Sequence, residues 1–210
     1  MHAGDIVLFQ GDSITDCGRD REAAAPNDPA ALGRGYAMLA ASAVRAYSTG
    51  VDVHNRGISG NEASDLLGRW NTDCVALGPT VVSVLIGVND MWRKMDSGKP
   101  NTVEQYDREL GELLDRTRAE LPGVRLIVCE PFALRVGAVT DAWFPEFDER
   151  RAVARKHAER VGARWVAFQD VFDRACARAS AEYWAHDGVH PSLAGHRLMA
   201  DAWLKAADGI

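Results

Sequence analysis

A serine near the start of the chain has the surroundings expected of a nucleophile. Ser13 lies in the segment GDSITD (residues 11–16), directly after a short apolar run. Gly11 permits a tight turn, and a serine that opens a helix lies where backbone amides favour negative charge. Such a hydroxyl could attack a carbonyl carbon while its own amide stabilises the resulting oxyanion. On its own, however, the segment fits an ordinary helix N-cap better, and Asp12 and Asp16 are expected to cap the same helix.

An aspartate and a histidine near the other end could supply the base that such a serine needs. In DGVHP (residues 187–191), Asp187 precedes His190 by three residues, so a turn would let the two side chains meet. Imidazole titrates in a range useful for general-base catalysis, and a carboxylate on its other nitrogen orients the ring. The segment could instead be a charged surface loop, or a metal site that includes His186. The metal interpretation is weaker because no other region offers further ligands, so no metal is expected.

Two further segments could donate hydrogen bonds to an oxyanion. Gly60 lies in NRGISGN (residues 55–61) and Asn89 in GVND (residues 87–90), each after a predicted strand. Separately, both read as ordinary turns, where Gly and Asn are common. Ser13, Gly60 and Asn89 nevertheless all follow the C-terminal ends of successive predicted strands, the edge at which open parallel sheets bind ligands. Their convergence with the D-x-x-H turn predicts a site for acyl transfer.

Short β-rich runs alternate with longer amphipathic ones along the whole chain, which predicts a single α/β domain over residues 1–210 with a mostly parallel sheet. The continuous apolar run at 81–86 is typical of a strand buried on both faces. A helix should begin after Thr102, whose hydroxyl forms a capping box with Gln105, and Ser192 should cap the last helix. The predicted strands cover residues 6–9, 51–54, 81–86, 124–129 and 164–168.

Composition excludes several classes of partner. The 210 residues include 24 Lys and Arg against 30 Asp and Glu, and the net charge of -6 disfavours binding to nucleic acid or to anionic lipid. No apolar stretch approaches the roughly 20 residues that a membrane-spanning helix needs. The four cysteines are scattered without a CxxC pair, and the N-terminus lacks the pattern of a secretory signal. Both features predict reduced thiols and a cytoplasmic location.

The four motifs together resemble a known family. GDSITD, NRGISGN, GVND and DGVHP match, in order, the signature blocks of the SGNH hydrolases, the GDSL-type esterases and lipases. The resemblance implies a three-layer α/β/α, flavodoxin-like sandwich with a five-stranded parallel sheet, and catalysis without a metal or organic cofactor. It implies that Ser13 is the nucleophile and that Asp187 and His190 are the acid and base. The amides of Ser13 and Gly60 and the side chain of Asn89 would form the oxyanion hole.

Longer stretches indicate a substrate class. GDSITDCGR, DLLGRW and IGVNDMWR look like the intracellular acetylxylan esterases of this group, which remove acetyl groups from xylo-oligosaccharides. Two departures are visible: Ile14 replaces the leucine of GDSL, and Gly188 stands where similar enzymes tend to carry arginine. The expected substrate is a small-molecule or oligosaccharide ester, and the chain could form a homo-oligomer. The alternatives are a lysophospholipase or thioesterase for longer acyl chains, and a carbohydrate-binding module without catalysis.

Several aromatic residues have two interpretations. Trp92 and Arg93 follow Asn89 closely and could flank the pocket, with a sugar ring stacked on Trp92, or Trp92 could simply pack. Trp184 allows the same two interpretations. Trp143, Phe144 and Phe147, at the end of the long segment 133–146 and just beyond it, could form a lid or an oligomer contact, although core packing is expected for at least one of them. Cys17 is expected on the helix of Ser13 as a small packed side chain.

Overall fold

Five parallel strands form the central sheet of the computed structural model, which describes residues 1–209. The strand order β2-β1-β3-β4-β5 is that of a flavodoxin-like sheet, as the resemblance implied. The chain changes direction across the sheet between β1 and β3, which pair in register from Val7 with Val81 to Gly11 with Leu85. Ligands of such sheets bind at this switch point. The strands are β1 (Ile6–Gly11), β2 (Asp52–Asn55), β3 (Val81–Leu85), β4 (Arg125–Cys129) and β5 (Arg164–Val166).

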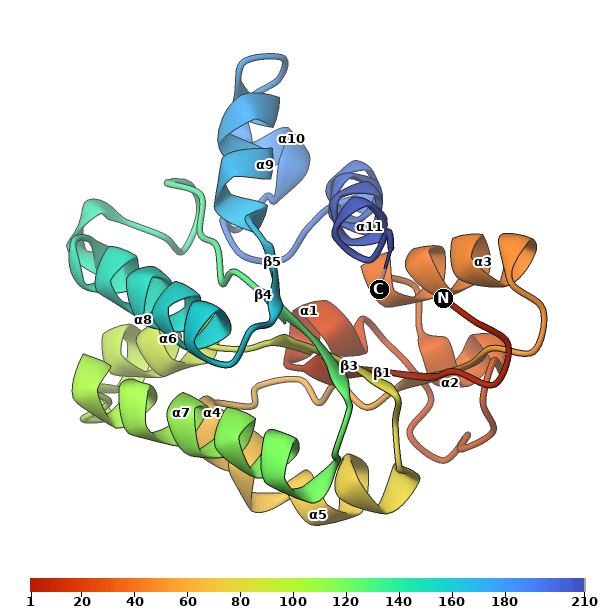
Figure 1. Cartoon of the computed structure of the whole chain (residues 1–210). Helices are drawn as coiled ribbons and strands as arrows, with labels where there is room; N and C mark the ends of the chain where they lie inside the picture. The colour runs from red at the N-terminus through yellow and green to blue at the C-terminus, as the bar shows by residue number, and fades with distance from the viewer. Residues whose placement is uncertain (210) are drawn as a thin grey trace.

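Helices cover both faces of the sheet and complete three layers (Figure 1). One layer contains α3 (Tyr36–Tyr47), α9 (Phe168–Cys176) and α11 (Leu193–Ala206). The other contains α4 (Ala63–Gly68), α5 (Trp70–Asp73), α7 (Val103–Glu120) and α8 (Glu146–Arg160). Shorter helices and α6 lie in the connections: α1 (Ser13–Asp16), α2 (Pro29–Leu32), η1 (Val75–Leu77), α6 (Val88–Ser97), η2 (Asp141–Trp143) and α10 (Ala181–Trp184).

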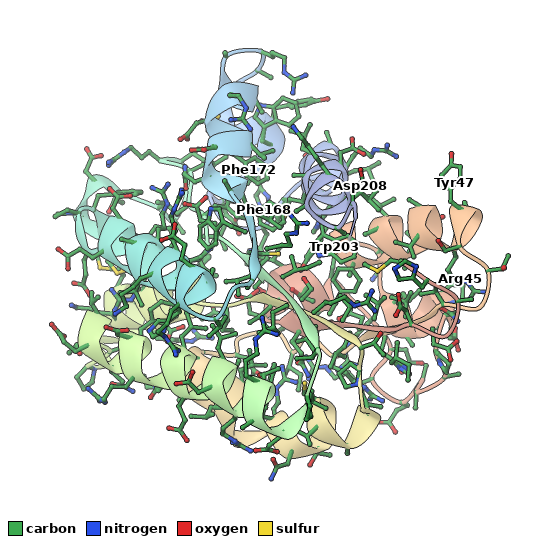
Figure 2. The ribbon with its side chains drawn as sticks, viewed as in Figure 1. Arg45, Tyr47, Phe168, Phe172, Trp203 and Asp208 are labelled. Atoms are coloured by element: carbon green, nitrogen blue, oxygen red, sulfur yellow. The ribbon has the colours of Figure 1, made fainter. Side chains whose placement is uncertain are left out.

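The sheet divides the apolar core into two clusters. All five residues of β3 are buried, and Val81 and Leu85 pack into one cluster while Val82 and Val84 pack into the other. This confirms the prediction of a strand covered on both faces. On the α11 side, Trp203 is fully buried (Figure 2) and its indole nitrogen donates to Ser83 Oγ at 2.9 Å.

The predicted element ends are mostly correct. Thr102 caps α7 by accepting a hydrogen bond from the Gln105 amide at 3.1 Å, and Ser192 caps α11 in the same way. The reciprocal half of the capping box is wrong, because the Gln105 side chain bonds to Glu109 one turn further along. The fifth strand ends at Val166, earlier than predicted, because Phe168 already begins α9.

The four cysteines, Cys17, Cys74, Cys129 and Cys176, are free thiols. Among residues 1–209, none of the helices combines the length and the apolar character that crossing a bilayer requires.

Candidate active site

Ser13 is the first residue of α1, immediately beyond the C-terminal end of β1. A side chain at Gly11 would have its Cβ only 2.3 Å from the Leu85 carbonyl oxygen, so the turn passes too close to β3 for any other residue. The Asp12 carboxylate accepts a hydrogen bond from the Ile14 amide at 3.0 Å, which confirms the predicted cap. The turn therefore presents Ser13 at the rim of the sheet.

The hydroxyl of Ser13 meets the acid and base from the other end of the chain. Ser13 Oγ lies 2.9 Å from His190 Nε2, and His190 Nδ1 lies 2.6 Å from Asp187 Oδ2. The second carboxylate oxygen, Oδ1, accepts hydrogen bonds from the amides of His190 at 2.8 Å and Val189 at 3.0 Å. When Nδ1 of the neutral ring donates to the carboxylate, Nε2 is left as an acceptor for the serine proton. The arrangement can therefore generate a nucleophilic oxygen.

Asp187 is held in its charged form. Its partial burial would raise its pKa, but the hydrogen bonds from the His190 ring and from the two amides outweigh that effect and lower the pKa. A carboxylate that stays ionised can stabilise the imidazolium that forms during catalysis.

The segment 133–139 supports the acid and base, a role that sequence reasoning missed. The Leu134 amide donates to the Gly188 carbonyl at 2.8 Å, and the Ala138 amide donates to the Asp187 carbonyl at 3.0 Å. Gly188 has a φ of +88°, and a Cβ there would lie 2.4 Å from the Leu134 carbonyl oxygen. Both the backbone conformation and the close approach therefore favour glycine at this position of the chain.

Two backbone amides beside the site are free to bind an oxyanion. Within residues 1–209, the amides of Ser13 and Gly60 have no hydrogen-bond acceptor. Asn89 lies in the first turn of α6 rather than in a turn before a helix, and its side-chain nitrogen donates to the Asn61 carbonyl at 3.0 Å. That amide nitrogen carries a second hydrogen, which remains available to a ligand. These three groups are suitable donors to a developing negative charge.

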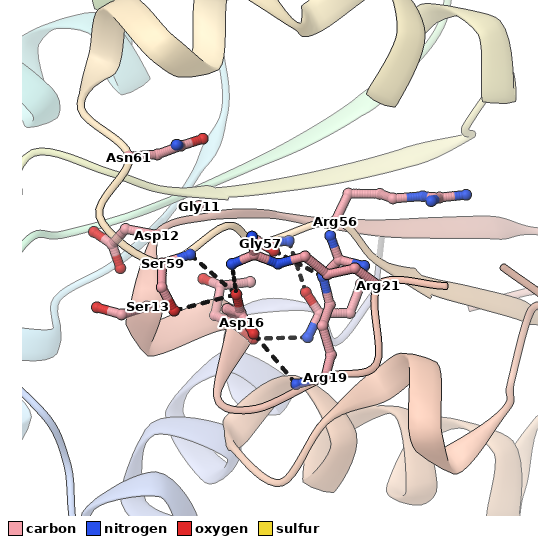
Figure 3. A network of polar contacts seen from close by, with 12 residues as sticks. Gly11, Asp12, Ser13, Asp16, Arg19, Arg21, Arg56, Gly57, Ser59 and Asn61 are labelled. Carbon is pink, nitrogen blue, oxygen red and sulfur yellow. Dashed lines mark hydrogen bonds and ion pairs between the residues drawn. The ribbon is translucent and has the colours of Figure 1, made fainter. Parts of the chain in front are cut away.

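Asp16 holds the loop that carries Gly60 against α1 (Figure 3). Its Oδ2 atom accepts hydrogen bonds from the amide of Ser59 at 3.0 Å and the hydroxyl of Ser59 at 3.2 Å, and it pairs with Arg21 at 2.6 Å. The prediction that Asp16 caps the helix is wrong, because this residue ends α1 and bonds to the neighbouring loop instead. Burial would raise the pKa of Asp16, but the bonds from Arg21 and Ser59 outweigh it and lower the pKa.

Cys17 lies beyond the helix on which it was expected. Its φ of +38° places it in the left-handed region that ends α1. Cys17 Sγ is 3.3 Å from His196 Nε2, and His196 Nδ1 accepts a hydrogen bond from the Tyr36 amide at 3.2 Å. Burial lowers the pKa of His196 to about 4, so the ring is neutral and its Nε2 hydrogen points at the sulfur. The pair therefore packs α1 against α3 and α11.

Two side chains of α6 flank the site as predicted. The Trp92 ring centroid lies 5.8 Å from that of His190, and the side chain is only partly buried. A Cβ at Gly60 would lie 3.4 Å from a terminal nitrogen of Arg93, which places this guanidinium beside the potential oxyanion donor. The site therefore has an aromatic ring beside His190 and a cation beside Gly60.

The other aromatic residues considered in the sequence, Trp143, Phe144, Phe147 and Trp184, are buried or partly buried. Trp143 and Phe147 are 2% and 0% exposed, so core packing accounts for both. Phe144 is partly buried beneath the Arg135 guanidinium, which lies 3.8 Å from its ring centroid. Trp184 is also buried, and its indole nitrogen donates to the Ala179 carbonyl at 3.3 Å.

Two buried carboxyl groups lie beneath the site, and sequence reasoning missed their shared environment. Burial raises the pKa of Asp12 to about 7, with a further contribution from the charge of Asp90. Burial likewise raises the pKa of Asp90 to about 7, although Asp90 accepts hydrogen bonds from the Ala63 amide and Asn101 at 3.3 Å. Within the described residues, Asp12 Oδ2 is buried without a hydrogen-bond partner. The only hint in the sequence was that each aspartate directly adjoins a predicted site residue.

The two histidines of the C-terminal motif, His186 and His190, lie in different surroundings. His186 is exposed, whereas the His190 ring lies between Ser13 and Asp187. Among residues 1–209, no three His, Cys, Asp or Glu side chains are grouped as metal ligands would be.

Comparisons with known proteins find relatives that match almost the whole chain. The chain is 35% identical over 209 residues to an acetylxylan esterase from Geobacillus stearothermophilus, which covers 97% of this chain and 94% of that protein. A crystal structure of an acetylxylan esterase from that organism matches with a TM-score of 0.89 and 34% identity, covering 99% of this chain and 96% of that one. A Parabacteroides merdae protein described as a GDSL-like lipase matches with a TM-score of 0.95 and 44% identity, covering 98% and 96%.

The family resemblance seen in the four motifs is confirmed by a match over most of the chain. Residues 9–198 fit the model of the GDSL-like lipase/acylhydrolase family, and this range includes every residue of the site. The chain belongs to the GDSL-like lipase/acylhydrolase family and is a serine carboxylic ester hydrolase.

Proposed function

We propose that this enzyme hydrolyses short acyl esters, above all acetyl esters of carbohydrates such as acetylated xylo-oligosaccharides, through an acyl-enzyme on Ser13. The observation that carries the proposal is the continuous hydrogen-bonded line from Ser13 Oγ through His190 to Asp187, with distances of 2.9 and 2.6 Å. The amides of Ser13 and Gly60, which have no hydrogen-bond acceptor within residues 1–209, support it.

The proposed reaction has two halves. His190 Nε2 takes the proton of Ser13 as its oxygen attacks the ester carbonyl, and Asp187 stabilises the imidazolium. The oxyanion is bound by the amides of Ser13 and Gly60 and by the second hydrogen of the Asn89 side chain. The tetrahedral intermediate collapses, and His190 gives its proton to the departing alcohol. Water then attacks the acyl-enzyme with the same assistance, which releases the acid and restores Ser13.

A carbohydrate as the alcohol part is supported by the rim of the site. Trp92 offers an aromatic face beside His190, and sugar rings stack on such faces. The Arg93 guanidinium beside Gly60 can donate hydrogen bonds to hydroxyl or carbonyl oxygens. The relatives named as acetylxylan esterases support an acetyl group as the acyl part. A cytoplasmic location and a homo-oligomeric assembly stay predictions of the sequence.

Turnover of short esters by a Ser13→Ala variant tests the nucleophile. Loss of this hydroxyl should lower kcat for p-nitrophenyl acetate by several orders of magnitude, as loss of a triad member does. Ser48→Ala is a matched control, because Ser48 is a partly buried serine at the far end of α3. A Ser13→Ala variant as active as the control would contradict the proposed role.

Two substrate series test the specificity. Nitrophenyl esters of increasing chain length should show the highest kcat/KM for acetate, whereas a preference for octanoate would favour a lysophospholipase or thioesterase.

Acetylated xylo-oligosaccharides should be deacetylated, and a Trp92→Ala variant should show a raised KM for them but not for p-nitrophenyl acetate. Binding of the sugars without any deacetylation would favour a carbohydrate-binding module.

A further inference from the structure

We propose that Arg69 is a positioning residue that assembles the oxyanion hole by joining the nucleophile turn to the loop that carries Gly60. The inference rests on the proposed function, because it assigns a role within the same site. Arg69 lies at the junction of α4 and α5, outside the four motifs, and its side chain is 15% exposed.

The guanidinium of Arg69 bonds to three separate segments. Nε donates to Asn61 Oδ1 at 2.7 Å, and Nη2 donates to the Gly11 carbonyl at 3.2 Å. Nη1 lies within 2.9 Å of three acceptors, which are Gln10 Oε1, the Arg56 carbonyl and Asp73 Oδ2. One rigid group therefore fixes the end of β1, both sides of the β2–α4 loop and α5 relative to one another.

These contacts lie next to each proposed oxyanion donor. Gly11 is two residues before Ser13, and its carbonyl also accepts a hydrogen bond from the Ile58 amide at 3.0 Å. Asn61 directly follows Gly60, and its carbonyl accepts the hydrogen bond that orients the Asn89 side chain. Arg69 therefore contacts Asn61, and Asn61 in turn binds the Asn89 side chain, so a residue outside the site is connected to a proposed oxyanion donor through two hydrogen bonds.

The chemistry of the side chain suits this role. A guanidinium presents five hydrogens in a planar fork, whereas a lysine ammonium is a point charge that cannot span three directions in a plane. Burial lowers the pKa of Arg69 and the bond to Asp73 opposes that effect, but an arginine stays protonated near neutral pH. Carbonyl and amide oxygens form most of its contacts, which favours a role in fixing backbone geometry over one in simple charge pairing.

The decisive experiment compares Arg69→Ala with Arg125→Ala. Arg125 is a partly buried arginine at the opposite end of the sheet, where it pairs with Asp5 and bonds to Thr80. Removing one oxyanion donor costs about 10²- to 10³-fold in kcat, and misplacing donors should cost less, so we expect kcat of Arg69→Ala to fall about 10- to 100-fold with KM nearly unchanged. Arg125→Ala should lower Tm yet keep its kcat at a temperature where it is folded.

Two further measurements separate positioning from general damage. Guanidinium ion at millimolar concentration should restore part of the kcat of Arg69→Ala and none of that of Asn89→Ala. The loss in the double variant Arg69→Ala/Asn89→Ala should be smaller than the product of the two single losses, because both act on the same donor. If Arg69→Ala does not fold, Arg69→Lys replaces it in the kcat comparison and in the double variant, without the guanidinium measurement.

The outcomes distinguish this inference from the proposed function. An unchanged kcat in the Arg69 variant, multiplicative losses in the double variant, or an equal kcat loss in Arg125→Ala would overturn the positioning role while the wild type remains an active esterase. An inactive wild type, or an active Ser13→Ala variant, would instead overturn the proposed function.

Discussion

At the scale of single residues, Asp187 has two tasks that use different oxygens. Oδ2 contacts the His190 ring, while Oδ1 accepts two backbone amides of the same turn. The second task fixes the carboxylate, so that the first can fix the tautomer of the ring. A substitution that keeps the shape but changes the charge separates the two.

An Asp187→Asn variant should lose kcat on the order of 10⁴-fold, because an amide that donates to Nδ1 forces the proton onto Nε2, where it faces Ser13. Steady-state kinetics with p-nitrophenyl acetate measure this loss. Asp201→Asn changes an exposed carboxylate on α11 and should leave kcat unaltered. An Asp187→Asn variant within tenfold of the wild type would show that the carboxylate does not control the ring.

The buried Asp90 should make stability depend on pH. Its pKa is about 7 in the folded protein against an ordinary value of 3.8, so its favourable contribution to stability is complete below about pH 4 and is lost as the pH rises through about 7. An asparagine at position 90 does not ionise, so the Asp90→Asn variant does not lose this stability as the pH rises. The free energy of unfolding of the variant minus that of the wild type should therefore increase between pH 4 and 8, by on the order of 1 kcal/mol or more. Urea titrations across this range measure the difference, and a flat or falling difference would contradict a neutral buried Asp90.

At the scale of elements, the β2–α4 loop is the part that the site depends on most closely. It supplies Gly60, and it is fixed to α1 through the bonds of Ser59 to Asp16 and to β1 through Ile58. The ends of β1, β2 and β3 alone would bring these segments to one edge of the sheet. The loop contacts then set the positions of the donors within that edge.

A Gly57→Ala variant should disturb this loop. Its Cβ would lie 2.4 Å from the Asp16 amide nitrogen, and that backbone cannot move aside without shifting α1. We expect a loss of about 1–3 kcal/mol in stability, together with a lower kcat. Gly68→Ala is the matched control, because nothing lies within 4 Å of a Cβ there and a helical alanine should stabilise by about 0.5–1 kcal/mol. Equal Tm values for the two variants in thermal unfolding would contradict this account of the loop.

At the scale of the whole molecule, both ends of the chain must dock on the sheet before the site exists. α11 follows the acid and base, and it is anchored by Trp203, which packs on Phe9 of β1 with ring centroids 4.8 Å apart. Phe9 lies on the strand that leads to Ser13. The same contact therefore ties the strand of the nucleophile to the helix that follows the base.

Trp203→Ala should lower the free energy of unfolding by about 3–5 kcal/mol, because it leaves a cavity and removes the hydrogen bond between the indole and the Ser83 hydroxyl. Tyr47→Ala removes an aromatic ring from the same helical layer that is 92% exposed, and it should change stability by less than about 0.5 kcal/mol. Denaturant titrations of both variants give the comparison. Similar losses in the two would mean that α11 is not anchored by its tryptophan.

Much of the fold and the site could be predicted from the sequence, because three of the four polar motifs directly follow apolar strands and parallel strand ends share one edge. The D-x-x-H motif follows α10 instead, and its acid and base were predicted from residue type and spacing. Arg69 and the segment 133–139 could not be predicted. Their partners, such as Asn61 and Gly188, are specified only by the folded arrangement of distant segments. The left-handed Cys17 was missed for a local reason, since a non-glycine residue with positive φ gives no signal in sequence.

The most direct test is to trap the covalent intermediate. Rapid acid quenching during turnover of p-nitrophenyl acetate, followed by mass spectrometry of the peptides, should show one acetyl group per chain, attached at Ser13. The Ser13→Ala variant should show none. Acetylation at another residue with unchanged turnover in Ser13→Ala would contradict the account, since the ester would then be cleaved without the hydroxyl that faces His190.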